Sequence, residues 1–312
     1  MISKISIFSH RGGQTDYEKA RNDLATHNMP AENTLAAFKR ALGGGADGIE
    51  LDVIRTKDDK LAVIHTADLK QHIFNRGDEN IGYVGDYTLK ELQSNFRVGP
   101  RADGIIPELS DVMKLVADYQ AKGRDTMLNI ELKDVKGCEV ERSDKTDVKP
   151  LVAEYIKQGN VDKDKIILSS FSYKDIKVAE QMNLGVKLAV LFDEEKAGGS
   201  KVYINDGDTY LAFTPDNIAK VQAEIPSLYA VHGEIKDVDE KALIDLKQRN
   251  LALGTWSAAE DHPTTQKAFF DNLKQLIQKH DVKANIITNF AHEMQPVLAD
   301  ELELDNKGKK VD

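Results

Sequence analysis

Gly48-Ile-Glu-Leu-Asp-Val-Ile54, followed by Leu61-Ala-Val-Ile-His65, places two carboxylates and a histidine within apolar runs that are typical of strands. Glu50 and Asp52 are two residues apart, so on a strand both side chains point to the same face. Carboxylates side by side in an apolar strand repel each other and lose hydration, so they usually share a cation. The pattern therefore predicts a divalent-metal site with a proton carrier, His65, beside it. The plainer alternative is a solvated strand face on which the alternation is accidental.

The connection from Arg55 to Lys60 decides how these two strands pair. It is too short for a parallel crossover, which needs roughly a dozen residues. We therefore expect a hairpin that turns at Asp58-Asp59. Such a hairpin sets His65 opposite Asp52 and one step from Glu50.

Short β-rich runs alternate with helical patterns along the whole chain. The expected strands are Ile5–Ser9, Gly48–Val53, Met127–Leu132, Lys165–Ser169, Val186–Phe192, Leu228–His232, Ala252–Trp256 and Asn285–Thr288. The expected helices include Glu32–Leu42, Thr88–Leu92, Pro107–Ala117, Lys149–Gln158, Tyr173–Met182, Asp239–Arg249 and Thr264–His280. Alternation on this scale predicts an α/β fold, a parallel sheet closed into a TIM (β/α)8 barrel, with an open doubly wound sheet as the second possibility.

No linker rich in Pro, Gly or Ser divides the chain, so we expect a single barrel domain over residues 1–304. A polar insertion at about 66–103 follows the early strands, and 13–29 and 194–208 look like further excursions. Residues 305–312 have no apolar anchor and are expected to form a flexible tail.

The composition excludes several classes of protein. The chain has 312 residues, 41% of them hydrophobic and 30% charged, which is typical of a globular protein with a full core. A net charge of −10 makes nucleic acid and anionic membranes poor partners. Against this background, a phosphate-bearing substrate needs a local positive site built from a metal ion and arginine.

The beginning of the chain bears on its compartment. Met1–Phe8 lacks the basic region and long apolar stretch of a signal peptide, and no run of about 18 apolar residues is present to span a membrane. The single cysteine, Cys138, cannot form an intrachain disulfide. We therefore expect a cytoplasmic protein, with export left open if a leader has been removed.

Four further features could take part in chemistry. His10-Arg11 ends the first expected strand, on the face of a barrel where active sites lie. Glu32 opens the first expected helix, where stabilising the helix N-terminus would explain it equally well. Glu131 and Lys133 repeat the acidic pattern at another strand end, and Arg11 and Lys133 could be ordinary surface ion pairs. Trp256, the one tryptophan, closes a late strand and could simply fill the barrel mouth.

Taken in order, His10-Arg11, Glu50-Leu51-Asp52 and His65 resemble the signature of the glycerophosphodiester phosphodiesterase family, one of the phospholipase-C-like barrel phosphodiesterases. Further similar segments span nearly the whole chain, most strongly from residue 9 to 133. They are Glu32–Phe38, Gly45–Asp52, Gly82–Val84, Thr88–Leu92, Ile106-Pro107, Ile130–Lys133, Ser169–Phe171, Gly254–Trp256 and Ile286–Asn289. One such fragment is weak evidence, but this many in order is strong evidence.

The resemblance implies a barrel that binds one divalent cation, Mg²⁺ or Ca²⁺, through Glu50, Asp52 and Glu131. Glu32 is implied as a further ligand or as a carboxylate that supports the others. All four are hard oxygen donors, which suit these ions.

Roles for the other residues follow from the same resemblance. His10 and His65 are implied as general base and general acid, in an order that the sequence leaves open. Arg11 and Lys133 would hold the phosphoryl oxygens, and Trp256 would stack on the glycerol moiety. The implied reaction is the hydrolysis of a small glycerophosphodiester to glycerol 3-phosphate and an alcohol.

One departure from the family pattern leaves other functions open. Thr66 stands where the family has an aspartate after the second histidine, and a hydroxyl carries no charge to tune His65. The alternatives are a phosphodiesterase of lysophospholipid or sphingolipid head groups, a phosphodiester-binding pseudoenzyme, and a barrel isomerase or aldolase. The last would want a phosphate-binding glycine loop after a late strand, and 286–290 offers no glycine. Head-group preference, the choice of metal and oligomeric state are not predicted.

Overall fold

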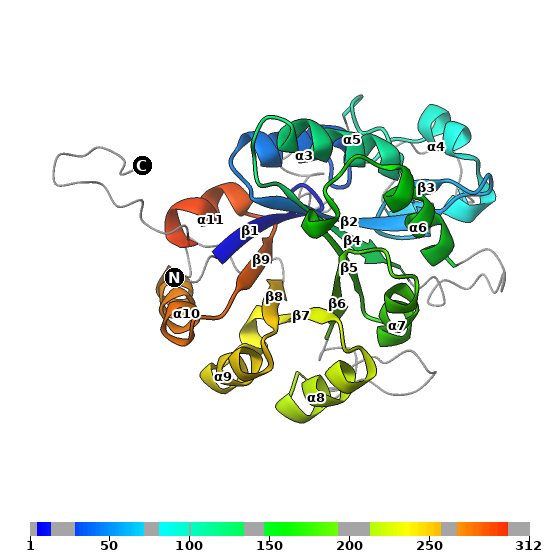
Figure 1. The fold of residues 1–312 in the computed structure, drawn as a ribbon. Coiled ribbons are helices and arrows are strands. Elements are labelled where there is room, and N and C mark those ends of the chain that lie inside the picture. Colours follow the sequence, from blue (N-terminus) through cyan, green and yellow to red (C-terminus); the bar gives the residue numbers. More distant parts are fainter. Residues whose placement is uncertain are drawn as a thin grey trace.

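The computed structural model describes residues 5–13, 29–71, 81–99, 101–133, 147–192, 213–256 and 267–298. Its centre is a ring of parallel strands (Figure 1). The strands are β1 (Ile5–His10), β2 (Gly48–Arg55), β4 (Met127–Leu132), β5 (Ile166–Ser170), β6 (Lys187–Leu191), β7 (Leu228–Glu234), β8 (Ala252–Trp256) and β9 (Ala284–Thr288).

The ring closes because β1 pairs in parallel with both β9 and β2. Around the ring the order is β1, β2, β4, β5, β6, β7, β8 and β9, and every neighbouring pair is parallel. The predicted (β/α)8 barrel is therefore confirmed, and the open doubly wound sheet is excluded because it has no such closure.

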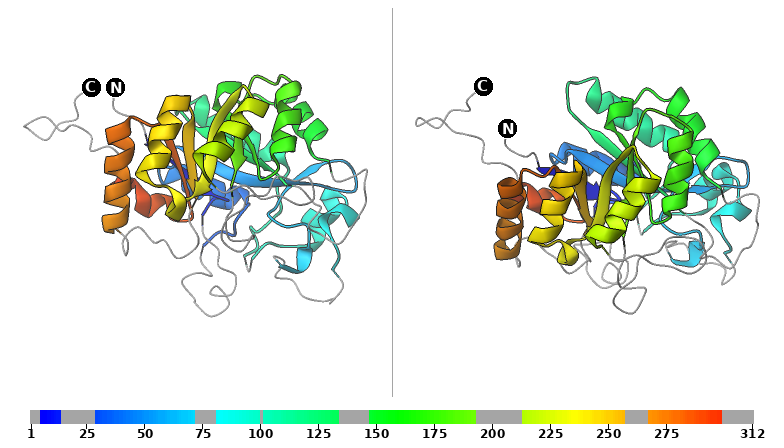
Figure 2. Two further views of the ribbon diagram at one scale, coloured as in Figure 1. Left: turned by 90° about the horizontal axis from the view of Figure 1, so that it is seen from below. Right: turned by 60° about the horizontal axis from the view of Figure 1, so that its bottom comes forward.

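Helices surround the barrel (Figures 1 and 2). They are α3 (Leu35–Gly43), α5 (Leu109–Gln120), α6 (Lys149–Gln158), α7 (Tyr173–Gln181), α8 (Pro215–Glu224), α9 (Glu240–Arg249), α10 (Lys267–His280) and α11 (Ala291–Leu298). The sequence reading did not single out α8 and α11. Within the described residues, no helix is both long and apolar enough to cross a membrane.

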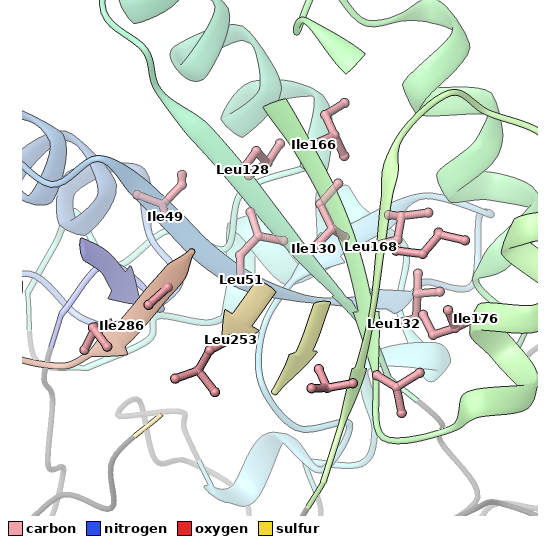
Figure 3. Close-up of a cluster of buried hydrophobic side chains, with 14 of the residues drawn as sticks. Ile49, Leu51, Leu128, Ile130, Leu132, Ile166, Leu168, Ile176, Leu253 and Ile286 are labelled. Carbon is pink, nitrogen blue, oxygen red and sulfur yellow. The ribbon is translucent and has the colours of Figure 1, made fainter. Parts of the chain in front are cut away.

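Side chains alternate between the two faces of each strand, so the barrel has an apolar core under the helices and a second one inside the ring. The site residues lie on the inner face. Ile49 and Leu51 of β2 point outward into the large apolar cluster beneath the helices (Figure 3). A second cluster, drawn from strands all around the ring, fills the inside of the barrel; it consists of Phe8, Ile167, Ala189, Ala230, Ala252 and Ile287. A Cβ added at Gly48 would lie 3.1 Å from the Phe8 ring, which shows that this position faces inward. Glu50 and Asp52, in phase with Gly48, therefore face the barrel interior.

The predicted hairpin is confirmed, but its predicted register is wrong. The antiparallel partner of β2 is β3 (Leu61–Val63), and Val53 lies opposite Val63. The Ile64 N–H donates to the Asp52 carbonyl, so Ile64, not His65, is opposite Asp52. The reason is the loop, which has three residues, 57–59, rather than two. Asp59 takes the left-handed conformation, φ 59°, that commonly ends such a loop.

The insertion carries short elements of its own and lies to one side of the barrel (Figure 2). They are η1 (Leu69–Gln71), η2 (Val84–Asp86) and α4 (Leu89–Asn95), which share an apolar cluster with the β2–β3 hairpin. The predicted excursion at 194–208, the tail at 305–312 and Cys138 lie outside the described residues, as do most of 13–29 and residues 72–80 of the insertion.

Candidate active site

The turn after β1 brings the first two site residues to the carboxyl end of the barrel. The Arg11 N–H donates to the Glu50 carbonyl at 3.0 Å and to the Glu50 carboxylate at 3.1 Å. Arg11 itself has a positive φ of 53°, and Gly12 follows at 87°. A Cβ at Gly12 would lie 2.7 Å from the Ala37 Cβ, so glycine lets this turn pack against α3. The turn thereby fixes Arg11 beside Glu50.

The segment before α3 adds an amide that sequence reasoning missed. The helix begins at Leu35 with Thr34 as its N-cap, so Glu32 precedes the helix rather than lying in its first turn as expected. Thr34 supplies the cap because its hydroxyl accepts from the Ala37 N–H. Between them, Asn33 donates from Nδ2 to Asp52 Oδ2 at 3.0 Å. The sequence offered one indication of a role for Asn33, which was its place directly after Glu32 in a segment that resembles the family.

Three carboxylates meet at this end of the barrel. Glu50 and Asp52 come from β2 and Glu131 comes from β4, where it lies opposite Asp52 in the parallel register. One oxygen from each lies within 4.8 Å of the others, and all three residues are buried. The carboxyl ends of neighbouring parallel strands meet at one edge, which explains how residues 79 positions apart along the chain converge. The arrangement can hold an oxygen-seeking cation.

Two basic side chains neutralise this cluster. Lys133 Nζ lies 2.9 Å from Asp52 Oδ1 and 2.7 Å from Glu131 Oε1. Arg11 Nε lies 3.4 Å from Asp52 Oδ2, and its Nη1 lies 3.5 Å from Glu32 Oε2. The predicted alternative of ordinary surface ion pairs is wrong for both residues, since the carboxylates that they contact are buried. Glu32 pairs with Arg11 and is not one of the three clustered carboxylates.

Burial and neighbouring charges give these carboxyl groups opposite proton affinities. Burial, with the charges of Asp52 and Glu131, raises the pKa of Glu50 well above its usual value. Burial also raises the pKa of Glu131, although Lys133 opposes it. Burial alone would raise the pKa of Asp52, but Lys133, Arg11 and His65 hold it well below the usual range. Asp52 is therefore the carboxylate whose charge the fold itself stabilises.

The two predicted histidines both reach this cluster. His10 Nδ1 lies 2.9 Å from Asn289 Oδ1, and its Nε2 lies 3.9 Å from Glu50 Oε2. Burial and the Arg11 charge lower the pKa of His10 to about 3, so the ring is neutral. His65 follows β3, and its charge contributes to the low pKa of Asp52. Thr66 beside it donates its hydroxyl to the Asp68 carbonyl at 3.1 Å.

Trp256 lies on the other side of the barrel mouth. It ends β8, two strands away from β1 around the ring, and packs edge-on against Phe171 at a centroid distance of 6.4 Å. The structure thus brings eight of the nine predicted residues together on the β1–β2–β4 side and separates Trp256 from them. Asn289, like Asn33, was not given a role from the sequence, although it directly follows the last strand.

The sequence profile of the glycerophosphoryl diester phosphodiesterase family matches residues 10–293. The chain belongs to this family. A glycerophosphodiester phosphodiesterase of Caldanaerobacter subterraneus is 33% identical over 193 residues, covering 61% of this chain and 67% of that protein. A relative of the same description from Bacillus altitudinis is 35% identical over 189 residues, covering 59% of this chain and 65% of that protein. The match to these relatives thus spans about two thirds of their length.

Solved structures agree with the fold of this glycerophosphoryl diester phosphodiesterase family member. A phosphodiesterase of Oleispira antarctica, solved in complex with the product sn-glycerol-3-phosphate, has a TM-score of 0.64 and covers 95% of this chain and 97% of its own. At 17% identity this likeness supports the barrel alone. The predicted family and enzyme class are confirmed by the family match, whereas the roles of individual residues stay predictions.

Proposed function

We propose that this protein hydrolyses small glycerophosphodiesters to glycerol 3-phosphate and an alcohol, with the help of one divalent cation. The observation that carries the proposal is the meeting of three buried carboxylates, two histidines and two basic side chains at one edge of a barrel. This set of groups can bind a phosphodiester, move two protons and balance the charge. This set of groups differs from the phosphate-binding loop that is typical of a barrel isomerase or aldolase.

Glu50, Asp52 and Glu131 are the residues that would hold the cation. Their donors are all oxygen, which suits Mg²⁺ or Ca²⁺. The Lys133 ammonium already bridges Asp52 and Glu131 at 2.9 and 2.7 Å, so the carboxylates converge on a point where a positive charge is stable. A bound divalent cation would supply charge stabilisation for the phosphoryl oxygens. Lys133 and Arg11 would bind those oxygens, and Glu32, which lies 3.5 Å from Arg11 Nη1, would hold the arginine in place.

His10 is the better candidate for the general base. The Asn289 amide oxygen can only accept a hydrogen bond, so with this amide orientation the proton of a neutral His10 sits on Nδ1. Nε2 then presents its lone pair to the cluster and can accept a proton. His65, whose charge interacts with Asp52, would be the general acid.

The chemistry divides into two proton-balanced steps. A glycerol hydroxyl attacks the phosphorus and gives its proton to His10, while the bond from phosphorus to the alcohol oxygen breaks and that oxygen takes a proton from His65. A water molecule then opens the cyclic phosphate. It gives a proton to His65, and the released glycerol oxygen takes one from His10. Both histidines return to their starting states, and one water is consumed.

The direct test is the release of glycerol 3-phosphate from glycerophosphocholine and glycerophosphoethanolamine in Mg²⁺, Ca²⁺ or chelator. We expect metal-dependent release that falls by about 10²–10⁴-fold in His10→Ala and is lost in Glu50→Ala. His280→Ala is the matched control, since that histidine contacts Glu240 on the outside of the barrel and should keep full activity. No release with either metal would contradict the proposal and direct attention to lysophospholipid or sphingolipid head groups.

A separate measurement tests the two-step course. Cyclic glycerol phosphate should be detectable early in the reaction and should itself be hydrolysed by the enzyme. Hydrolysis that proceeds while added cyclic phosphate stays untouched would contradict this course and leave direct attack by water.

A further inference from the structure

A second polar site lies at the ends of β7 and β8. Along β7 the inward positions include Ala230, His232 and Glu234, because Ala230 belongs to the apolar cluster inside the barrel. Glu234 lies opposite Trp256 of β8 in the parallel register. Its side chain is 4% exposed, so this carboxylate is buried at the barrel mouth. The predicted mechanism gives it no task.

This site lies across the mouth from the carboxylate cluster. In the closed ring, β7 is four strands from β2, and β8 is four strands from β4, which is the opposite position in a ring of eight. Figure 1 shows β7 and β8 on the side of the barrel away from β2 and β4. A substrate whose phosphate lies against the cluster and which spans the mouth would bring one of its two ends toward Glu234 and Trp256.

The neighbours of Glu234 show what chemistry it accepts. Lys236 Nζ lies 2.7 Å from Glu234 Oε2, and the lysine side chain is 47% exposed. A half-exposed, long side chain is easily displaced, so the ammonium marks a place for a cation that reaches the carboxylate from the solvent side. The Trp256 indole N–H is buried and has no acceptor among the described residues. Phe171 stands edge-on to the indole, with an interplanar angle of 82°.

We infer that Glu234, with Trp256 and Phe171, forms a recognition site for a cationic alcohol head group of the diester, in place of the stacking of Trp256 on glycerol that the family resemblance implies. Aromatic faces beside a carboxylate are the features that bind quaternary and primary ammonium groups. Of the two ends of a glycerophosphodiester, glycerol is uncharged, so it gives a buried carboxylate no compensating charge. This inference rests on the proposed function, but binding of the head group can be measured without turnover.

Trp256 is the only tryptophan in the chain, so its fluorescence reports on this site alone. Choline chloride should change the fluorescence saturably, whereas 3,3-dimethylbutanol, its uncharged analogue, should bind about tenfold more weakly. Sodium chloride at equal ionic strength controls for salt. In Glu234→Gln the difference between choline and the analogue should vanish. Glu224→Gln, which removes an exposed carboxylate paired with Lys177 at the end of α8, should keep it.

Lys236→Met provides a second variant that does not touch the carboxylate. Removing the competing ammonium should tighten choline binding several-fold. Equal binding of choline and its analogue by the unaltered protein, or choline binding that Glu234→Gln leaves unchanged, overturns the inference. Weaker choline binding in Lys236→Met overturns it as well, because Lys236 would then be a ligand-binding residue and not a competitor.

Turnover separates this inference from the proposed function. In Glu234→Gln, kcat/KM for glycerophosphocholine should fall about tenfold more than kcat/KM for glycerophosphoglycerol, whose head group is neutral. An equal fall for both diesters would assign Glu234 to the shared glycerol half and overturn the inference while leaving the hydrolase intact. Choline binding without turnover of any diester would support the inference and contradict the proposed function.

Discussion

The two sides of the barrel mouth differ in how their buried carboxylates are neutralised. On the β1–β2–β4 side, Asp52 is contacted by Lys133, Arg11 and Asn33, so its charge is compensated within the chain. On the β7–β8 side, Glu234 forms an ion pair with Lys236, whose side chain is half-exposed. A buried charge that several side chains contact is held in one arrangement, whereas a charge with one half-exposed partner keeps binding capacity for a ligand. Without a bound cation, the charge on the first side is therefore balanced within the chain, whereas the second side depends more on an exchangeable partner.

The largest expected effect is a loss of stability on the β1–β2–β4 side of the mouth. Asp52→Asn leaves Lys133 and Arg11 facing a neutral side chain, and it should lower the free energy of unfolding by about 3–5 kcal/mol. Glu234→Gln, the matched change on the other side, should cost less than about 1 kcal/mol because Lys236 can turn to water. Urea unfolding of both variants in chelator at pH 7.5 measures the difference. Equal losses would show that the two sides do not differ in this way.

The next effect concerns His232, which lies beneath Glu234 on β7. Its ring is fully buried, and neither ring nitrogen has a hydrogen-bond partner in the described part of the chain. Burial lowers the pKa of His232 to about 4. Because the unfolded chain binds the proton more readily, the stability from this group is complete above pH 6.5 and is lost as the pH falls toward 4.

The loss should reach about 3 kcal/mol over that window. His232→Phe keeps a ring of similar size and removes the titration, so its stability should depend less on pH than that of the unaltered protein. Unfolding in urea at pH 7.5 and pH 4.5 tests this for both proteins. An identical pH dependence in the two proteins would contradict the expectation.

A smaller effect tests how tightly the β7–β8 side is packed. A Cβ added at Gly254 would lie 2.0 Å from the His232 ring. Gly254→Ala should therefore overpack the barrel and cost about 1–3 kcal/mol. In a His232→Ala background the same change should cost little, since the ring is gone, and a double-mutant cycle of unfolding free energies isolates the coupling. Additive costs would place the strain elsewhere.

The smallest expected effect is a difference in stability between two substitutions within the carboxylate cluster. Since burial and its neighbours disfavour the charged form of Glu50, Glu50→Gln should stabilise the metal-free protein by about 1 kcal/mol, opposite in sign to Asp52→Asn. Mg²⁺ or Ca²⁺ should then raise the melting temperature of the unaltered protein but not of this variant. A variant that is less stable than the unaltered protein in chelator would contradict the prediction.

Much of the fold could be predicted because buried parallel strands are continuous apolar runs. Met127–Leu132 and Ala252–Trp256 were predicted to the residue, as was the helix at Lys149–Gln158. The hairpin register was wrong by one position because a two-residue turn was assumed. Loop length fixes register, and the left-handed Asp59 that sets it is not evident from composition.

The site could be predicted only in part, for a related reason. The acidic and histidine residues stand out because they are costly inside apolar strands. Asn33 and Asn289 do not stand out, since an asparagine near a turn is ordinary in any sequence. Their contacts with Asp52 and His10 join residues 19 and 279 positions apart, and the second contact needs the barrel to close between β1 and β9.

The hydrogen bond between His10 and Asn289 also determines when the site can be completed during protein synthesis. It joins the first strand of the barrel to the residue just after the last strand, so it cannot form until all eight barrel strands have left the ribosome. A nascent chain holds every clustered carboxylate more than a hundred residues before it holds Asn289. The orientation of His10 is therefore among the last features of the barrel that synthesis completes, and a chain that stops before Asn289 cannot fix this imidazole through that residue.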